Sequence, residues 1–169
     1  MPNPFAWSAD WAWSLPLIVL TVLIHVSGLA LFSEAALRFI ARVSGWRQPK
    51  MGFMLIVGAT VLFASCLHGI EVTIWASAYR FLGALTDFRS SVLYSLNAMT
   101  SYGHADLSLA YHWQLMGALE ALDGWQLFGL TAAFLFALIQ KMWLLSIREP
   151  DPCGSDTKTR LRLVDSGSR

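Results

Sequence analysis

The sequence predicts an all-α membrane protein in which three helices cross the bilayer and a fourth, short helix does not. The chain has 169 residues, of which 56% are hydrophobic and only 14% are charged, whereas a soluble domain carries about 25% charged residues. A bilayer-spanning helix needs roughly 20 mainly apolar residues. Three segments meet that length, namely 13–32, 51–70 and 113–145.

The basic residues predict how these spans are oriented. All but two of the twelve Lys and Arg residues lie either between the first two spans or from the last turns of the third span onwards. Three spans put both groups on one side of the membrane, and Lys and Arg are enriched on the cytoplasmic side. We therefore expect the N-terminus outside and the C-terminus in the cytoplasm. The residues concerned are Arg38, Arg42, Arg47, Lys50, Lys141, Arg148, Lys158, Arg160, Arg162 and Arg169.

The N-terminal elements are a short outer segment, 1–12, and then the first span with its basic connector, 13–50. No basic residue precedes Arg38, and a secretory signal has a basic start, so we expect the first span to be retained. From Ser33 to Gly45 the sequence has the signals of a helix, which either continues the span or lies on the cytoplasmic surface. At the other end, residues 149–169 are rich in Pro, Gly, Ser and charge and are expected to be disordered.

The second span is expected to form a helix over 51–79, and a shorter helix follows over 87–99. Asp87 suits the N-cap of this short helix, and apolar residues follow it at helical spacing. Twelve residues give roughly 18 Å of helix, which cannot cross a hydrocarbon core of about 30 Å. Because both neighbouring spans leave it outside, the helix has to enter and leave the membrane on that side. Such a re-entrant helix must be packed among other helices.

The segment "TSYGHAD", residues 100–106, follows the short helix. A helix C-terminus carries about half a negative charge, so a helix that dips inward would stabilise a cation at its end. Gly103 permits the positive φ that lets successive carbonyl oxygens face one axis. Rings of backbone carbonyls can replace the hydration shell of an ion. A closed ring needs several copies of the chain around a symmetry axis.

This arrangement resembles the pore module of potassium-channel-like cation channels, which consists of an outer helix, a pore helix, a filter and an inner helix. The family filter reads T-V-G-Y-G-D, and "SYGHAD" aligns with it one residue to one position after an additional Thr, with Gly103 and Asp106 identical. The similarity covers 51–145, within a pore module expected over 51–148, and the first span is an addition. It implies a homotetramer in the bacterial inner membrane. It also implies that the carbonyls of Ser101, Tyr102 and Gly103 bind K⁺ or another monovalent cation. The filter residues so implied are Thr100, Ser101, Tyr102, Gly103, His104, Ala105 and Asp106.

Two filter positions depart from the family pattern. Ala105 stands where the family has Gly, and left-handed geometry costs a non-Gly residue about 1–2 kcal/mol. His104 stands where the family has Tyr, so a weakly selective channel is an alternative to a potassium-selective one. His104 either faces the outer mouth or packs behind the filter. If it faces the mouth, we expect cation current to fall as external pH drops through about 6.5, where an unperturbed histidine titrates. An unchanged pH response in His104→Tyr would contradict that expectation.

The third span, 113–145, would be the inner helix. It would reach roughly 50 Å, so it tilts or projects into the cytoplasm. Glu120 and Asp123 share one face of this helix. The resemblance implies structural support behind the filter for Glu120, whereas Asp123 could face the cavity and concentrate cations. Gly124 could serve as a hinge or allow close packing against another helix.

His25 and His68 lie in the first two spans, which run antiparallel. Each is expected to bond a neighbouring helix, and Glu71 lies three residues after His68 and could bond it within the same helix. A haem held between the two imidazoles is an alternative.

We therefore predict a cation channel subunit, with membrane lipid and further copies of the same chain as its partners. The sequence has no phosphate-cradling Gly loop, paired Cys motif or nucleophile elbow, so we expect neither an enzyme nor a resident cofactor. A net charge of +1 gives no reason to expect nucleic acid. The alternatives are a weakly selective cation channel, a non-conducting membrane scaffold with the same fold, and a small haem-binding redox subunit.

Overall fold

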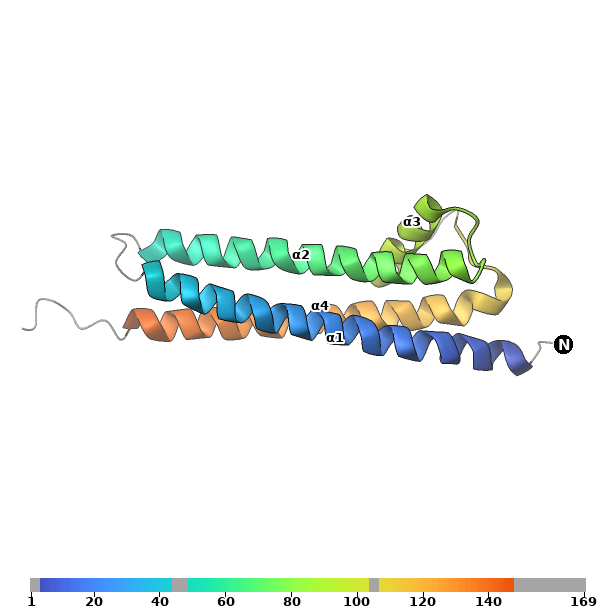
Figure 1. Ribbon diagram of the computed structural model, residues 1–169, viewed down its shortest axis with the longest axis horizontal. Coiled ribbons are helices and arrows are strands. Elements are labelled where there is room, and N and C mark those ends of the chain that lie inside the picture. The colour runs from blue at the N-terminus through green and yellow to red at the C-terminus, as the bar shows by residue number, and fades with distance from the viewer. Residues whose placement is uncertain (1–3, 44–48, 104–106, 148–169) are drawn as a thin grey trace, which may run out of the picture.

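The chain forms three long helices that lie side by side and one short helix. The computed structural model describes residues 4–43, 49–103 and 107–147. In chain order the elements are α1 (Pro4–Val43), α2 (Pro49–Phe81), α3 (Phe88–Met99), the 3₁₀ turn η1 (Tyr111–Trp113) and α4 (Gln114–Ile147). Figure 1 shows α3 beside the C-terminal end of α2, at the end of the bundle where the chain begins. The end of α1, the start of α2 and the end of α4 lie together at the opposite end.

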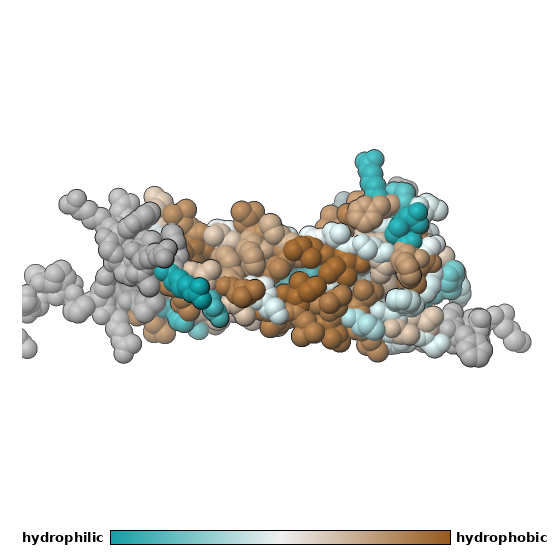
Figure 2. Space-filling view, viewed as in Figure 1, coloured by the Kyte–Doolittle hydropathy of each residue, from teal (hydrophilic) through white to brown (hydrophobic). Residues whose placement is uncertain are grey.

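The three long helices are the three predicted spans. By length and composition the candidate spans are Ser8–Arg38, Met51–Phe81 and Tyr111–Leu144, with mean hydropathies of 2.3, 2.0 and 1.7. Hydrophobic side chains cover the middle of the face seen in Figure 2, and the hydrophilic ones lie mainly towards the two ends. The chain is thus a multi-pass, all-α membrane protein, as the sequence predicted.

The first helix is longer than the sequence indicated. Of the two alternatives for the segment from Ser33 to Gly45, the structure has the one in which the helix continues the span, as far as Val43, where the described part of α1 ends; the helix also begins as early as Pro4. Pro16 lies inside α1, a tolerated position because membrane helices contain more Pro than soluble ones. Near the far end, the Arg38 guanidinium donates to Glu34 Oε2 over 3.1 Å, an i,i+4 pair of the kind that supports a helix.

The short helix α3 has the start that was predicted for it. Asp87 is its N-cap, and the Ser90 N–H donates to Asp87 Oδ1 over 2.8 Å. Hydrogen bonds from Ser90 hold the pKa of the exposed Asp87 carboxyl below its ordinary value. The turn before it contains Gly83 with φ +67°, a conformation that Gly adopts without steric cost.

A tight turn ends α3 and aims the chain away from it. The Ser101 N–H donates to Ala98 O and the Tyr102 N–H donates to Asn97 O, each over 3.0 Å. These two bonds form a Schellman motif, in which the residue after the C-cap takes a left-handed conformation. Ser101 occupies that position with φ +54°, and Gly103 follows with φ +89°. Gly103 therefore has the positive φ expected of it, whereas the positive φ of Ser101 was not predicted.

The main hydrophobic core lies where α2, α3 and α4 meet. Tyr79 and Tyr94 pack edge to face with ring centroids 5.3 Å apart. A Cβ built on Gly124 would lie 2.7 Å from Met99 Cα, so the C-terminus of α3 is seated directly on the backbone of α4. At 1.5 Å per residue this contact is about 15 Å along α4 from its start. The larger buried members of this core are Trp75, Tyr79, Tyr94, Met99, Met116 and Leu127.

Candidate functional site

Two groups of residues are candidates for a functional site, and the first is segment 100–106. Of its seven residues, Thr100, Ser101, Tyr102 and Gly103 are described and all four are exposed. Tyr102 is the most open, with 85% of its surface accessible in the single chain. The remaining three, His104, Ala105 and Asp106, lie outside the described residues.

Side-chain hydrogen bonds hold the described part of this segment. Thr100 Oγ1 donates back to Leu96 O over 2.7 Å. From α4, Trp125 Nε1–H donates to Ser101 Oγ over 2.9 Å. The segment borders an open hollow between α3 and α4, lined mainly by Asn97, Ser101, Gly103, Gly117, Ala118 and Ala121. The small residues of α4 thus leave one side of the segment uncovered within a single chain.

The second group is a column of buried polar side chains inside the bundle, and Glu120 forms its layer nearest to α3. The Glu120 carboxylate is fully buried. Tyr79 Oη donates to Glu120 Oε2 over 2.6 Å, and the Ser95 hydroxyl donates to Glu120 Oε1. This one carboxylate therefore joins α2, α3 and α4, which is the geometry of a residue that supports the seat of α3.

Asp123 forms the next layer and is also fully buried. Its Oδ2 accepts hydrogen bonds from Thr21 Oγ1 over 2.8 Å and from Trp75 Nε1–H over 3.0 Å. The side chain therefore faces α1 and α2 of its own chain. This arrangement departs from the alternative in which Asp123 faces a cavity and concentrates cations. The neighbouring Gly124 packs against Met99, so close approach is its role in this structure.

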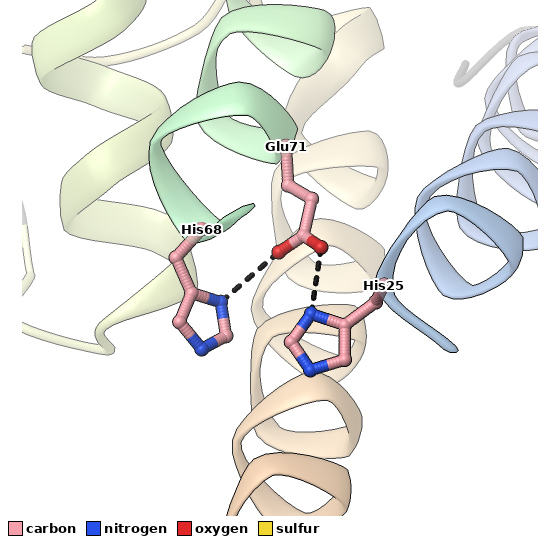
Figure 3. A group of neighbouring side chains, drawn as sticks. All are labelled: His25, His68 and Glu71. Atoms are coloured by element: carbon pink, nitrogen blue, oxygen red, sulfur yellow. Dashed lines mark hydrogen bonds and ion pairs between the residues drawn. The ribbon is translucent and has the colours of Figure 1, made fainter. Parts of the chain in front are cut away.

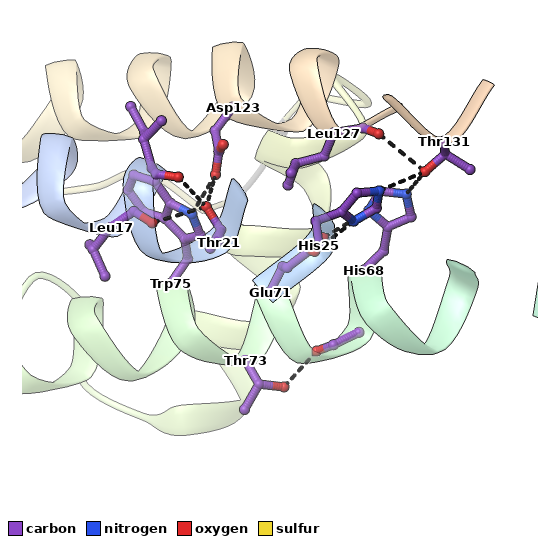
Figure 4. A network of polar contacts seen from close by, with 12 residues as sticks. Leu17, Thr21, His25, His68, Glu71, Thr73, Trp75, Asp123, Leu127 and Thr131 are labelled. Atoms are coloured by element: carbon purple, nitrogen blue, oxygen red, sulfur yellow. Dashed lines mark hydrogen bonds and ion pairs between the residues drawn. The ribbon is translucent and has the colours of Figure 1, made fainter. Parts of the chain in front are cut away.

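The third layer contains both span histidines, Glu71 and Thr131, which together we call the histidine cluster. Figure 3 shows Glu71 between the two imidazole rings. His25 Nδ1 lies 2.8 Å from Glu71 Oε1, and His68 Nδ1 lies 3.0 Å from Glu71 Oε2. On the other side of the rings, Thr131 Oγ1 lies 2.9 Å from His25 Nε2 and 3.5 Å from His68 Nε2. Figure 4 shows the cluster beside the layer formed by Thr21, Trp75 and Asp123.

Hydrogen bonds to neighbouring side chains and a haem between the imidazoles were the two expectations for the histidines. His25 bonds neighbouring helices, and His68 bonds Glu71 within its own helix, as expected. For haem, one nitrogen from each ring would have to approach the iron from opposite faces. Here the ring centroids are only 5.1 Å apart, and each of the four ring nitrogens faces Glu71 or Thr131. The geometry gives the haem alternative no support.

Sequence reasoning named the acidic and histidine members of this column and missed most of their partners. Thr21, Trp75, Tyr79, Ser95 and Thr131 were not singled out as partners. A signal for some of them exists, because Glu71, Trp75 and Tyr79 recur every four residues in the second span and so lie on one helix face. Thr21 and His25 have the same spacing in the first span. A polar residue recurring at this spacing within an apolar span marks the face that is turned away from lipid.

The comparisons with known proteins add no assignment to this geometry: no family model, curated protein or solved structure matches the chain.

Proposed function

We propose that this chain is one subunit of a homotetrameric cation channel, with α3 as a re-entrant pore helix and segment 100–106 as its filter. The main support for the proposal is the contact between the C-terminus of α3 and Gly124 of α4. A helix of 12 residues is too short to cross the bilayer. Yet its end contacts α4 about 15 Å inside that helix, which is roughly half the thickness of the hydrocarbon core.

The electrostatics of this end favour a cation. The C-terminal end of a helix carries about half an elementary negative charge, and four copies around one axis would aim four such ends at a shared point. The backbone of Ser101, Tyr102 and Gly103 comes directly after it, and its carbonyl oxygens are the proposed ligands. Two positive φ values in three residues, at Ser101 and Gly103, are what a chain needs to turn several carbonyls towards one direction.

The exposed face of the single chain supports an assembly of several copies. Tyr102 and the hollow between α3 and α4 are open on this face. In the proposed arrangement this face lies within the membrane, so lipid would contact the exposed backbone of segment 100–106 if the chain were alone. Irregular backbone at membrane depth is tolerated only where protein or water covers it. Three further copies around a four-fold axis would provide both, with protein at the sides and a water-filled path at the centre.

The mechanism proposed is passive permeation. A monovalent cation, K⁺ or Na⁺, sheds its water, is held by carbonyl oxygens of segment 100–106 and is displaced by the next ion. In this proposal α3 lies on the outer side of the bacterial inner membrane, and the basic end of the bundle lies in the cytoplasm. Glu120 has no direct part in conduction, since it holds α3 through Ser95 and α2 through Tyr79.

A matched pair of glycine variants tests the proposal. Gly103 and Gly83 both have positive φ, and no described atom lies within 4 Å of a Cβ built on either. An Ala at either site therefore adds a similar backbone cost of about 1–2 kcal/mol, but only Gly103 lies in segment 100–106. We expect K⁺ flux from proteoliposomes of the wild type, flux close to wild type from Gly83→Ala, and at least a tenfold loss in Gly103→Ala. Wild-type liposomes without flux, from protein that runs as a tetramer, would favour the scaffold alternative.

A weakly selective channel is the second candidate, and a specific observation favours it. Ser101 stands at the Thr position of the family filter, yet its N–H closes the Schellman turn on Ala98 O. That turn differs from a uniformly extended filter strand, and Ala105 and His104 add two further departures from the family pattern. Flux of Na⁺ comparable with that of K⁺ would select this candidate.

A further inference from the structure

The histidine cluster presents several electron-pair donors to one point in the middle of the bundle. His25 and Glu71 are completely buried, and His68 keeps 33% of its side chain exposed. The one atom from each that could hold a metal ion lies within 4.8 Å of the other two. These three residues come from α1 and α2 near the middle of both candidate spans, where a charge is costly unless it is paired or coordinated.

The hydroxyl of Thr131 is the partner of the ring nitrogens that face away from Glu71. When Thr131 Oγ1–H donates to Leu127 O over 3.1 Å, its oxygen can accept from the Nε2–H groups of His25 and His68. A neutral imidazole that carries its proton on Nε2 has its lone pair on Nδ1. Both Nδ1 atoms face the Glu71 carboxylate, at 2.8 and 3.0 Å.

The three groups can be held together in two ways. Each imidazole can carry its proton on Nδ1 and donate it to Glu71, or a cation can lie between the two Nδ1 lone pairs and the carboxylate. With both protons on Nε2, the two lone pairs and the ionised carboxylate need positive charge between them. Extra protons could supply it, but two imidazolium groups with one carboxylate would leave surplus positive charge in a low-dielectric interior. One divalent ion satisfies all three donors together. The charge also balances, because the Asp123 carboxylate lies close enough to Glu71 and His25 to interact with both.

We propose that His25, His68 and Glu71 form a binding site for one divalent transition-metal ion of the Zn²⁺ class in each chain. Two imidazole nitrogens and a carboxylate oxygen are a donor set that Zn²⁺ favours, with a fourth position left for water. Imidazole ligands also suit Co²⁺, Ni²⁺ and Cu²⁺. Thr131 would be a positioning residue, since a metal-bound histidine usually donates its other N–H to a fixed acceptor. The ion would tie α1 to α2 in the middle of the membrane.

The experiment uses Co²⁺ as a visible probe of the full-length, untagged protein in detergent after treatment with a chelator. The chain has four histidines, His25, His68, His104 and His112, so a double variant can isolate either pair. We expect the wild type and His104→Ala/His112→Ala to bind one Co²⁺ per chain with the intense visible bands of a four-coordinate site. The pair His25→Gln/His68→Gln should bind at least about 100-fold more weakly, and Zn²⁺ should displace Co²⁺ from the wild type.

Two single variants refine the assignment. His68→Ala changes the most exposed ligand and is the least disruptive to the fold, so its far-UV circular dichroism should match that of the wild type while its Co²⁺ bands are lost. Thr131→Val keeps the shape of the side chain but removes the acceptor for both rings, and we expect about 10–100-fold weaker binding.

The proposal is overturned if His104→Ala/His112→Ala binds no Co²⁺, since that variant keeps the whole cluster and protons alone would then hold it together. It is also overturned if His68→Ala keeps the wild-type bands. Neither outcome depends on ion flux, so the metal site and the channel can fail separately.

Discussion

Segment 100–106 and the buried polar column differ in burial and in the number of partners that their polar groups have. In the column, each of the three carboxylates, Glu71, Asp123 and Glu120, lies within hydrogen-bonding distance of at least two other side chains of the same chain. In the segment, the four described residues are exposed and the backbone adopts positive φ twice. The polar atoms of the column thus find their partners within one chain, except Asp123 Oδ1, which is buried without one, whereas the described part of the segment is open on one side. The column therefore stabilises the fold of the single chain, and under the proposed function the segment would act only in an assembly of several chains.

Among the variants that test this comparison, the largest loss of stability is expected at Glu120. Glu120→Ala leaves the buried hydroxyl of Tyr79 without its acceptor, at about 1–3 kcal/mol for an orphaned group. The Ser95 hydroxyl keeps an acceptor in Val72 O, 3.0 Å away. We expect a loss of unfolding free energy of about 3 kcal/mol, measured by titration with SDS in mixed micelles and followed by circular dichroism. Glu120→Gln keeps an acceptor oxygen and should lose less.

The contrasting variant at the segment is Trp125→Phe, which removes the donor to Ser101 Oγ. Because water can replace that bond at an exposed site, we expect a change within about 0.5 kcal/mol in the same titration. If Trp125→Phe destabilised the protein as much as Glu120→Ala, the distinction between a buried column that stabilises the fold and an exposed segment that does not would be wrong.

The next effect in size concerns the seat of α3 on α4. A Cβ at Gly124 would meet the backbone of Met99, which cannot move aside as a side chain can, whereas no described atom lies within 4 Å of a Cβ built on Gly129. We expect Gly124→Ala to cost about 1–3 kcal/mol through overpacking. The matched control Gly129→Ala should be neutral or stabilising by up to about 1 kcal/mol, since Ala is the better helix former.

Circular dichroism would show whether α4 stays helical in both variants, and proteoliposome flux would show whether α3 stays in place. Equal stabilities of the two variants would mean that α3 does not rest on Gly124.

The sequence predicted those parts of the fold that depend on local pattern. Spans of uniform apolar character, the Asp87 cap and the short helix after it follow from length, spacing and capping chemistry, and all are present in the structure. The signals from Ser33 to Gly45 indicated a helix but could not decide whether it continued the first span. That outcome depends on how α1 packs against its neighbours.

The candidate sites were predicted less completely, for a physical reason. Spacing places Glu120 and Asp123 on one helix face, yet the first faces α2 and α3 and the second faces α1 and α2. Three residues further along the helix, the side chain already points to a different neighbouring helix. The local sequence pattern does not show which helix that is. In the same way, Ser101 carries no sequence signal for a left-handed conformation, because the Schellman turn depends on the direction in which the chain leaves α3.

The smallest expected effect is at the exposed cap of α3, and it depends on pH. Because hydrogen bonds from Ser90 lower the pKa of Asp87 in the folded protein, the cap contributes its full stability above the ordinary pKa of the carboxyl. That contribution is lost as pH falls below about 4 and through the lower folded pKa. Asn is about as good an N-cap as Asp but has no charge to favour the helix dipole. We therefore expect the wild type to unfold at a slightly higher temperature than Asp87→Asn at pH 6, and this difference to shrink steadily as pH falls below about 4. Asp87→Ala, which lacks the cap at any pH, should remain below Asp87→Asn throughout. A wild-type advantage that does not change with pH below about 4 would show that the charge of Asp87 is not what stabilises the start of α3.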